Sequence, residues 1–524
     1  MPRFKPCDFH ALMLPVVLSE QIVPGSFAFA LNYLVDHELD LSPLDAGFKN
    51  DITGASAFDP RVMLKIVLLA YSQGLISSRS IATACERNVQ FIALSGDSQP
   101  SHAHIAKFVA SLSDQIKPLF RQVLMTCDAQ GLIGREMFAI DGVKLPSNAS
   151  KERSGTHEEL SHRADRLDKA ADKILALHQA QDKAGAQEPL EAKRQARIDA
   201  LRQEAARTRD FVAKNHKRLN SKGQELKSNI TDPDSAKMAT NKGVIQGYAA
   251  QAAVDSSHQI IIAADVVGSG SEQTMLAPMI EQAKPWCDDN TLVTADAGYH
   301  SDGNVQQLHD SNTPALIADG QMRKRDERFE DRDKHKAKAD PLYDKQTAEQ
   351  PEQPEQGKHF RPKDFRFNDD NTASCPAGKV LISTGSIHLS AGGHPYQTYI
   401  AKATDCKSCT LRGQCLKSKG NSKNTDKAKE TRGRQVTRFF PKALDPTDPS
   451  ERMRQAIDSP RGRQLYSQRI GTVEPVFANL RHNKRLARLN HRGQAKVATQ
   501  WSLYCMVHNI EKLSKARFGK AGVQ

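Results

Sequence analysis

The stretch MFAIDGV, residues 137–143, decides the fold, because it is a short apolar strand that ends at Asp141. The stretch TLVTADAGY, residues 291–299, repeats the arrangement and ends at Asp296. Taken singly, such an aspartate is more often a turn residue or a helix cap than a metal ligand. The pair says more, because neighbouring strands bring such ends to one edge, where open α/β sheets bind ligands. Two carboxylates there repel each other, which predicts a shared proton or a bound divalent cation such as Mg²⁺ or Mn²⁺.

The segments around these strands predict the rest of a sheet. Residues 244–255 and 258–268 alternate in the manner of strands and predict an antiparallel hairpin that turns near Asp255. Residues 272–284 have the pattern of a helix, and TPALIAD, residues 313–319, that of another strand. Strands and helices in this order predict a mixed α/β sheet.

A long charged segment separates the first strand from the others. Within residues 156–220 the apolar positions Leu160, Leu167 and Ile174 recur every seven residues, and Gly185 interrupts the pattern. We expect a helical hairpin that projects from the sheet. A plain role as a spacer or in self-association stays open.

The N-terminal part, residues 27–127, has the pattern of a helical domain. IATACERN, residues 81–88, and VQFIALSG, residues 89–96, resemble two short helices at an angle. A DNA-binding helix-turn-helix and an ordinary bundle that packs or dimerises are equal alternatives.

Four cysteines follow a polar stretch, residues 323–370, whose composition cannot bury enough apolar surface to fold alone. Cys375, Cys406, Cys409 and Cys415 comprise one separate thiol, a C-x2-C pair and a fourth thiol. Because tetrahedral zinc takes four such donors, we expect structural Zn²⁺, and reduced unligated thiols are the alternative. The remaining cysteines are expected to be packing residues.

A third carboxylate lies in YSQRIGTVEPVFANLR, residues 466–481. Arg481 is two helical turns beyond Glu474 on the same face and could bind a DNA phosphate, while Arg469 and Tyr466 approach from the preceding turns. On spacing alone, a salt-bridged surface helix is the plainer interpretation.

Composition limits the partners and the cellular location. The 524 residues suit several domains, and 74 Lys and Arg against 61 Asp and Glu give a charge of +13, which favours a polyanionic partner. Apolar runs stay far below the ~20 residues of a membrane span, and the first residues do not form a signal peptide. We therefore expect no membrane association and a cytoplasmic, nucleoid-associated protein. Trp286 and Trp501 could stack on an extruded base, but core packing is the simpler expectation.

Taken together, the motifs resemble the DDE-class transposases of bacterial insertion sequences, which have a ribonuclease-H-like fold. The resemblance covers most of the chain and rests on a joint match. Its segments are SSRSIATACERN (77–88), FAIDGVKLPSNAS (138–150), SNITDPDSAKM (228–238), GYAAQAAVD (247–255), TADAGYHS (294–301), the cysteine cluster and TVEPVFANLR (472–481).

The resemblance implies that Asp141, Asp296 and Glu474 form the catalytic triad and hold two Mg²⁺ or Mn²⁺ ions. It also implies that Tyr466, Arg469 and Arg481 bind DNA beside the glutamate. Four residues separate Arg469 from Glu474 where the family's best-known pattern has three, and Arg481 replaces the usual lysine. These departures put the phosphate contact of Arg469 in doubt.

The implied activity is metal-dependent cleavage and strand transfer at the terminal inverted repeats of an insertion sequence, by a homodimer or larger assembly on DNA. A metal-dependent nuclease or resolvase, and a catalytically silent DNA-binding descendant of a transposase, are the alternatives. The expected fold is α/β with a ribonuclease-H-like mixed sheet. We expect an N-terminal helical DNA-binding or dimerisation domain (1–130), a first part of the catalytic core (131–319) with the hairpin insert (156–222), a zinc-bearing insert (320–445) and C-terminal core helices (446–524).

Overall fold

The computed structural model describes residues 16–48, 50, 56–182, 188–220, 223–240, 243–329, 360–390, 394–416, 433–440 and 447–518. The chain divides into two compact units, which are considered separately here. Unit 1 comprises Met1–Arg325 with Arg452–Gln524, and unit 2 comprises Asp326–Glu451. Gly185 and most of the polar stretch predicted over 323–370 lie outside the described residues. None of the described helices has the length and apolar character needed to cross a bilayer.

A six-stranded mixed sheet forms the centre of unit 1. Its strands are β1 (Met137–Pro146), β4 (Ala236–Thr240), β5 (Gly243–Asp255), β6 (Ile261–Val267), β7 (Leu292–Ala295) and β8 (Ala315–Ile317). β5 runs antiparallel to β1, β4 and β6, whereas β7 is parallel to β1 and β8 is parallel to β7. The predicted mixed α/β sheet and its β5–β6 hairpin are therefore present.

The first strand is longer than predicted. The sequence suggested that it ends at Asp141, but β1 continues to Pro146. The reason is the long neighbour β5, which pairs with β1 as far as Pro146 and Gly247. Asp141 therefore lies in the middle of the pairing of β1 with β5, but one residue beyond the last pair of β1 with β7.

Helices connect and cover these strands. They are α10 (Leu276–Ala283), α11 (Asp302–Asp310), α17 (Pro449–Asp458), α18 (Pro460–Ala478), a π-helical turn (Asn479–Asn483) and α19 (Gln494–Arg517). Trp501 of α19 is fully buried, and its indole N–H donates to the carbonyl oxygen of Gln251 on β5. Trp286 is also buried, so the core-packing expectation holds for both tryptophans.

Gln259, in the turn between β5 and β6, fastens both C-terminal helices. Pro475 lies inside α18 and has no backbone N–H, which deprives the carbonyl of Gly471 of its helical partner. The side-chain amide of Gln259 donates to that carbonyl at 3.2 Å. Its own carbonyl bonds His508 of α19 at 2.8 Å, and its side-chain oxygen accepts from Lys512. This turn therefore fixes α18 against the sheet.

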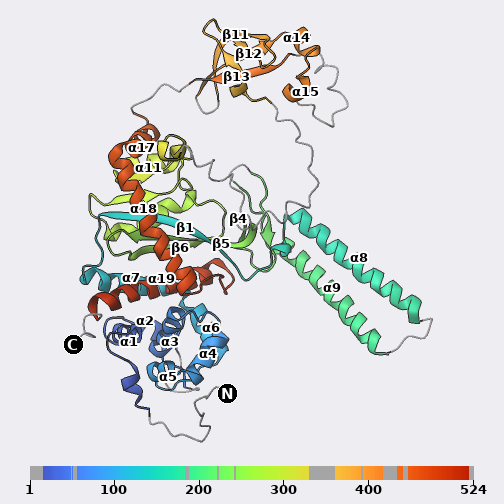
Figure 1. Ribbon diagram of the computed structural model, residues 1–524. Helices are drawn as coiled ribbons and strands as arrows, with labels where there is room; N and C mark the ends of the chain where they lie inside the picture. Colours follow the sequence, from blue (N-terminus) through green and yellow to red (C-terminus); the bar gives the residue numbers. More distant parts are fainter. Residues whose placement is uncertain are drawn as a thin grey trace, which may run out of the picture. The chain divides into compact units, whose positions relative to one another are not determined.

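The N-terminal helices form a bundle with α19. They are α1 (Phe27–His37), α2 (Ser42–Asp45), α3 (Pro60–Ser72), α4 (Ser78–Arg87), α5 (Val89–Ser95), α6 (His102–Ser111) and α7 (Ile116–Ala129). α19 runs between this bundle and the sheet (Figure 1), and it contacts α3, α7 and β6. Tyr71 of α3 stacks on Tyr504 of α19 with ring centroids 4.4 Å apart. One hydrophobic core runs from the bundle into the sheet.

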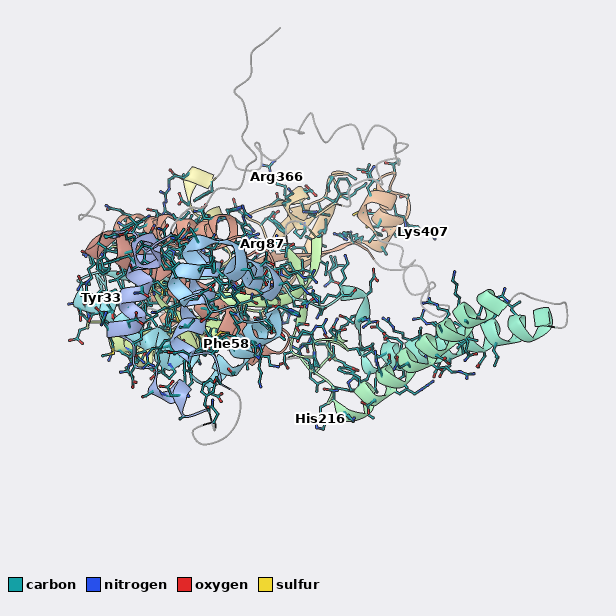
Figure 2. The ribbon with its side chains drawn as sticks, turned by 90° about the horizontal axis from the view of Figure 1, so that it is seen from below. Tyr33, Phe58, Arg87, His216, Arg366 and Lys407 are labelled. Atoms are coloured by element: carbon teal, nitrogen blue, oxygen red, sulfur yellow. The ribbon has the colours of Figure 1, made fainter. Side chains whose placement is uncertain are left out.

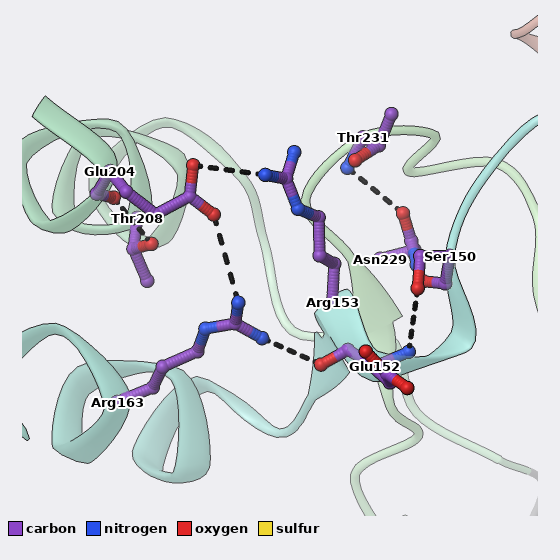
Figure 3. A network of polar contacts seen from close by, with 8 residues as sticks. All are labelled: Ser150, Glu152, Arg153, Arg163, Glu204, Thr208, Asn229 and Thr231. Atoms are coloured by element: carbon purple, nitrogen blue, oxygen red, sulfur yellow. Dashed lines mark hydrogen bonds and ion pairs between the residues drawn. The ribbon is translucent and has the colours of Figure 1, made fainter. Parts of the chain in front are cut away.

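The helical hairpin is present as α8 (His157–Asp182) and α9 (Glu188–Lys214), two helices that extend away from the sheet (Figure 1). Figure 2 shows side chains along the arms where they are described, and His216 lies beyond the end of α9. At the base, Glu204 of α9 forms ion pairs with Arg153 at 3.3 Å and with Arg163 of α8 at 3.7 Å (Figure 3). Asn229 donates to the carbonyl of Ser150 at 2.8 Å. These contacts join the hairpin to the strands β2 (Ser154–Gly155) and β3 (Ser228–Asn229).

The described part of unit 2 contains a five-stranded antiparallel sheet and two short helices. Its elements are β9 (Arg366–Phe367), β10 (Thr372–Ser374), β11 (Val380–Leu389), β12 (Pro395–Ala401), β13 (Gln435–Phe439), α14 (Ala403–Lys407) and α15 (Arg412–Cys415). The buried core is small and consists of Phe365, Ala373, Leu381, Tyr399, Ala401 and Val436. Short 3-10 turns in unit 2 span Glu327–Phe329 and Pro362–Asp364, and those in unit 1 span Leu18–Gln21, Leu112–Asp114, Lys151–Arg153, Gln273–Met275, Lys284–Trp286 and Met322–Lys324.

Candidate active site

The pairing of β1 with β7 places Asp141 beside Asp296. The parallel register ends at the pair Ile140 and Ala295, and each aspartate is the next residue of its strand. Asp141 Oδ1 accepts the N–H of Gly142 at 2.8 Å, and Asp296 Oδ1 accepts that of Gly298 at 2.8 Å. Two partly buried carboxylates are therefore held by their own backbone at one edge of the sheet.

Arg469 supplies a counter-charge from α18. Its Nη1 atom lies 3.0 Å from Oδ2 of Asp141, and the residue is only 8% exposed. The guanidinium carbon lies 5.8 Å from the ring centroid of Tyr466, one turn earlier on the same helix. Burial of the arginine beside Asp141 gives the ion pair a less screened setting than a surface pair has. The structure thus brings Asp141, Arg469 and Tyr466 together.

A further carboxylate, Glu272, belongs to this group and was not foreseen from the sequence. It lies in the turn before α10, with one carboxylate oxygen beside Gly142 and the other beside Gly298. A Cβ atom added at Gly142 would stand 2.9 Å from the first oxygen, and one at Gly298 would stand 3.0 Å from the second. The absence of side chains at these glycines therefore gives Glu272 its place between the two aspartates.

The electrostatics of the group agree with this geometry. Burial raises the pKa of Asp141, while Arg469 acts to lower it and Asp296 raises it further. Burial also raises the pKa of Glu272, and the charges of Asp296 and Asp141 add to the effect. Removal of carboxylates from water and their mutual repulsion both disfavour the charged forms, and a cation placed among them would relieve both costs.

The floor of the site is a buried polar pair. Tyr299 is fully buried, and its hydroxyl donates to the side-chain oxygen of Gln251, which faces Gly142 across the β1–β5 pairing. Burial raises the pKa of Tyr299, followed by the charges of Glu272, Asp141 and Asp296. A neutral phenol therefore holds Gln251, whose side chain lies against Gly142 next to Asp141.

Glu474 lies on α18, as expected, but in a different direction from Arg469. It is exposed, and the step of five positions from Arg469 to Glu474 corresponds to about 140° of rotation around an α-helix. Arg481 is exposed in the π-helical turn that follows α18. The structure thus groups Asp141, Asp296 and Glu272 with Arg469, whereas Glu474 stands apart from Arg469 on the same helix.

Two groups of donors have the chemistry of metal ligands. The carboxylates of Asp141, Asp296 and Glu272 are hard oxygen donors of the kind that Mg²⁺ and Mn²⁺ take. Even so, among the residues that the structure describes, no three His, Cys, Asp or Glu side chains are already disposed as a metal site. The case for a metal ion at the carboxylates therefore rests on their donor chemistry and on their closeness to one another.

The four predicted cysteines lie around one small cavity of unit 2. Cys375, Cys406, Cys409 and Cys415 line a cavity of about 30 Å³ at the end of the small sheet. Burial raises the pKa of the Cys415 thiol, Arg434 acts to lower it, and the other three cysteines act to raise it. Arg434, which the sequence pattern did not single out, donates its backbone N–H to the sulfur of Cys406 at 3.3 Å.

Two comparisons with protein families find matches. Residues 374–514 match a family described as "Transposase DDE domain", and residues 16–111 match one described as "Transposase domain (DUF772)". The first match includes the cysteines, Tyr466, Arg469 and Glu474, whereas Asp141, Glu272 and Asp296 lie outside both. A search of curated proteins finds no match.

Proposed function

Because the chain is a transposase of the insertion-sequence DDE type, we propose that Asp141 and Asp296 are catalytic carboxylates of metal-dependent DNA cleavage and strand transfer at the terminal inverted repeats. The observation that carries this proposal is the β1–β7 register, which ends one residue before each aspartate. We assign Glu474 as the third carboxylate because of the family resemblance. We add Glu272 because its carboxylate lies beside Gly142 and Gly298.

In this proposal Asp141, Asp296 and Glu474 hold two Mg²⁺ or Mn²⁺ ions, and Glu272 supports them. Ions bound there would activate a water or a DNA 3′-hydroxyl and stabilise the departing oxygen. Without ions, Arg469 balances the charge of Asp141, and Tyr466 packs against the guanidinium. Tyr466 and Arg481 contact the DNA, and Arg469 reaches a phosphate only when Asp141 takes another partner.

The cysteines complete the proposal. Cys375, Cys406, Cys409 and Cys415 hold one structural Zn²⁺, supported by their common cavity and by the donor chemistry of four thiols. The protein acts in the cytoplasm on nucleoid DNA, as a homodimer or larger assembly, because two element ends must be joined in one event.

The test supplies purified protein with labelled DNA that carries the element's terminal repeats, in Mg²⁺ and in EDTA. We expect nicked and joined products in Mg²⁺ only. Cleavage without joined products would replace the transposase reaction with that of a nuclease. Full strand transfer by the Asp141→Ala protein would refute the assignment of the site.

A further inference from the structure

The chain between Glu474 and Glu511 contains no acidic residue. Within it, residues 485–496, here called the basic segment, connect the π-helical turn to the first turn of α19. Four of its cations are exposed, namely Arg485, Arg488, Arg492 and Lys496. Most exposed charge runs are solvated and mobile, so the geometry of these side chains decides whether they form a surface for a ligand.

Two of the arginines are held in place by consecutive carbonyl groups. Arg488 donates its Nε–H to the carbonyl of Ser147 at 2.9 Å, and Arg492 donates its Nε–H to the carbonyl of Asn148 at 2.9 Å. Ser147 and Asn148 directly follow β1. Because both arginines remain exposed, the anchored Nε leaves the Nη side of each guanidinium accessible to a ligand.

The backbone of the segment is also fixed. Leu486 and Leu489 are fully buried, and the N–H of Leu489 donates to the carbonyl of Pro146 at 2.8 Å. The side chain of Asn490 donates to the carbonyl of Ile76 at 3.2 Å. A ligand that binds this segment therefore meets arginines that have already lost part of their conformational freedom.

A buried cation directly before the segment is already paired. Lys484 is 4% exposed and forms an ion pair with Glu511 of α19. Glu511 is therefore engaged by Lys484, and two further carboxylates, those of Asp232 and Asp234, accept the backbone N–H groups of Gly493 and Gln494 in the segment.

We propose that the basic segment binds the phosphodiester backbone of duplex DNA beside the candidate active site. The proposal rests on the transposase function and adds the location of a DNA-binding surface. Six residues of extended chain separate Asp141 from Ser147, which corresponds to about 20 Å, or roughly six base pairs of duplex at 3.4 Å each. The surface would hold DNA about half a helical turn from the bond that is cut.

Phosphate suits these side chains better than the carboxylates of an acidic protein surface do. A guanidinium whose Nε already donates a hydrogen bond still has two Nη groups that can donate together to one phosphate. Successive phosphates along a DNA strand can each accept from one arginine. The anchors give the two forks a fixed separation, which suits a ligand with regularly repeated charge. We therefore choose DNA and make an acidic polypeptide an outcome of the test.

The test measures binding of the full-length protein to a labelled 30-base-pair duplex in EDTA, by fluorescence anisotropy over a series of salt concentrations. The variant is Arg488→Gln with Arg492→Gln. We expect the slope of log K against log salt to fall by about 2 in magnitude, and affinity near 0.1 M salt to weaken on the order of ten- to a hundredfold. The matched control is Arg121→Gln with Arg207→Gln, two exposed arginines on α7 and α9. An unchanged slope in the first variant, a loss equal to the control's, or equal displacement by polyglutamate and DNA at matched charge would overturn the proposal.

Two further variants separate binding from folding. Lys496→Gln touches no anchor and should lower the slope by about 1 with an unchanged melting temperature. Arg488→Lys with Arg492→Lys keeps the charge and should keep most of the slope, but it should weaken binding because the Nε anchors are lost. Failure of the proposed function is distinguishable, since a wild-type protein that binds DNA with the expected slope but never nicks it in Mg²⁺ would refute catalysis and leave the surface intact.

Discussion

The two candidate metal sites of the chain rest on very different foundations. The carboxylates of Asp141 and Asp296 stand at the edge of a sheet whose core extends through the N-terminal bundle and α19. Two of the thiols of unit 2, those of Cys406 and Cys415, stand on helices of five and four residues, beside a core of six buried apolar residues. A short helix is not stable alone, and so small a core contributes little. The position of the carboxylates is therefore set by a large fold, whereas we expect that metal bound at the thiols would stabilise the small fold around them.

The two sites also differ in how positively charged side chains contact them. At the sheet edge, Arg469 reaches Asp141 from a long helix fixed by Gln259, so the site has a charge partner without any ion. At the cysteines, Arg434 supplies backbone and side-chain hydrogen bonds to Cys406 and Cys415 but cannot replace a tetrahedral ion. Loss of metal should leave the first site folded and disrupt the second.

The largest effect is expected from the cysteines. In Cys406→Ser, zinc bound per chain should fall, and unit 2 should lose its cooperative unfolding transition, because zinc binding contributes on the order of 10 kcal/mol to such small folds. Elemental analysis and calorimetry measure the two quantities. Cys287→Ser, a change at a partly buried cysteine of unit 1, is the control. A variant with unchanged zinc content and an intact transition of unit 2 would remove the proposed contrast.

Asp141→Asn should have the next largest effect, on activity alone. We expect cleavage to fall on the order of a thousandfold or more, because a charged group of the reacting site is lost. The melting temperature in EDTA should change little, because burial disfavours the charge of Asp141 and the amide oxygen of Asn can still accept a hydrogen bond from Arg469. Nicking rates and thermal unfolding are measured beside Asp289→Asn, an exposed acid. If the variant is instead unfolded or melts at a much lower temperature, the charge of Asp141 is needed for the stability of unit 1 and the prediction is wrong.

The loss of stability of unit 1 at low pH should depend on a buried histidine, His508. Burial lowers the pKa of His508 to about 4, from an ordinary value of 6.5. The folded state therefore favours the neutral ring, and its stabilising effect is complete above about pH 6.5 and is lost as the pH falls toward 4. The size is about 3 kcal/mol, since one pKa unit corresponds to 1.36 kcal/mol. In His508→Gln the unfolding free energy should lose this part of its pH dependence in urea titrations at pH 4.5 and 7. An unchanged pH profile would contradict the prediction.

A smaller effect should distinguish the two glutamates. Glu272→Gln is expected to reduce Mg²⁺ affinity about 10- to 100-fold, the range typical of residues that support metal ligands. Glu474→Gln should reduce it more if Glu474 is a ligand. Calorimetric Mg²⁺ titration compares the two, with Glu281→Gln, an exposed residue on α10, as control. Should Glu272→Gln prove the more damaging, the third carboxylate would belong to the turn before α10.

The fold and part of the site could be predicted because their signals are local. Asp141 and Asp296 each follow an apolar strand, and the heptad spacing of Leu160, Leu167 and Ile174 announces the hairpin. Glu272 gives no such signal, since it sits in a polar turn and meets the aspartates only through the sheet register and two distant glycines. Arg434 likewise approaches Cys406 only after the small sheet has formed. What local patterns miss are contacts that tertiary structure creates.

The late position of Arg469 has a consequence for biosynthesis. Asp141 leaves the ribosome 469 − 141 = 328 residues before its counter-charge, an interval of tens of seconds at about 5 to 20 residues per second. The helix with Arg469 is then secured by Gln259. A nascent chain therefore carries Asp141 without its counter-charge for most of its synthesis.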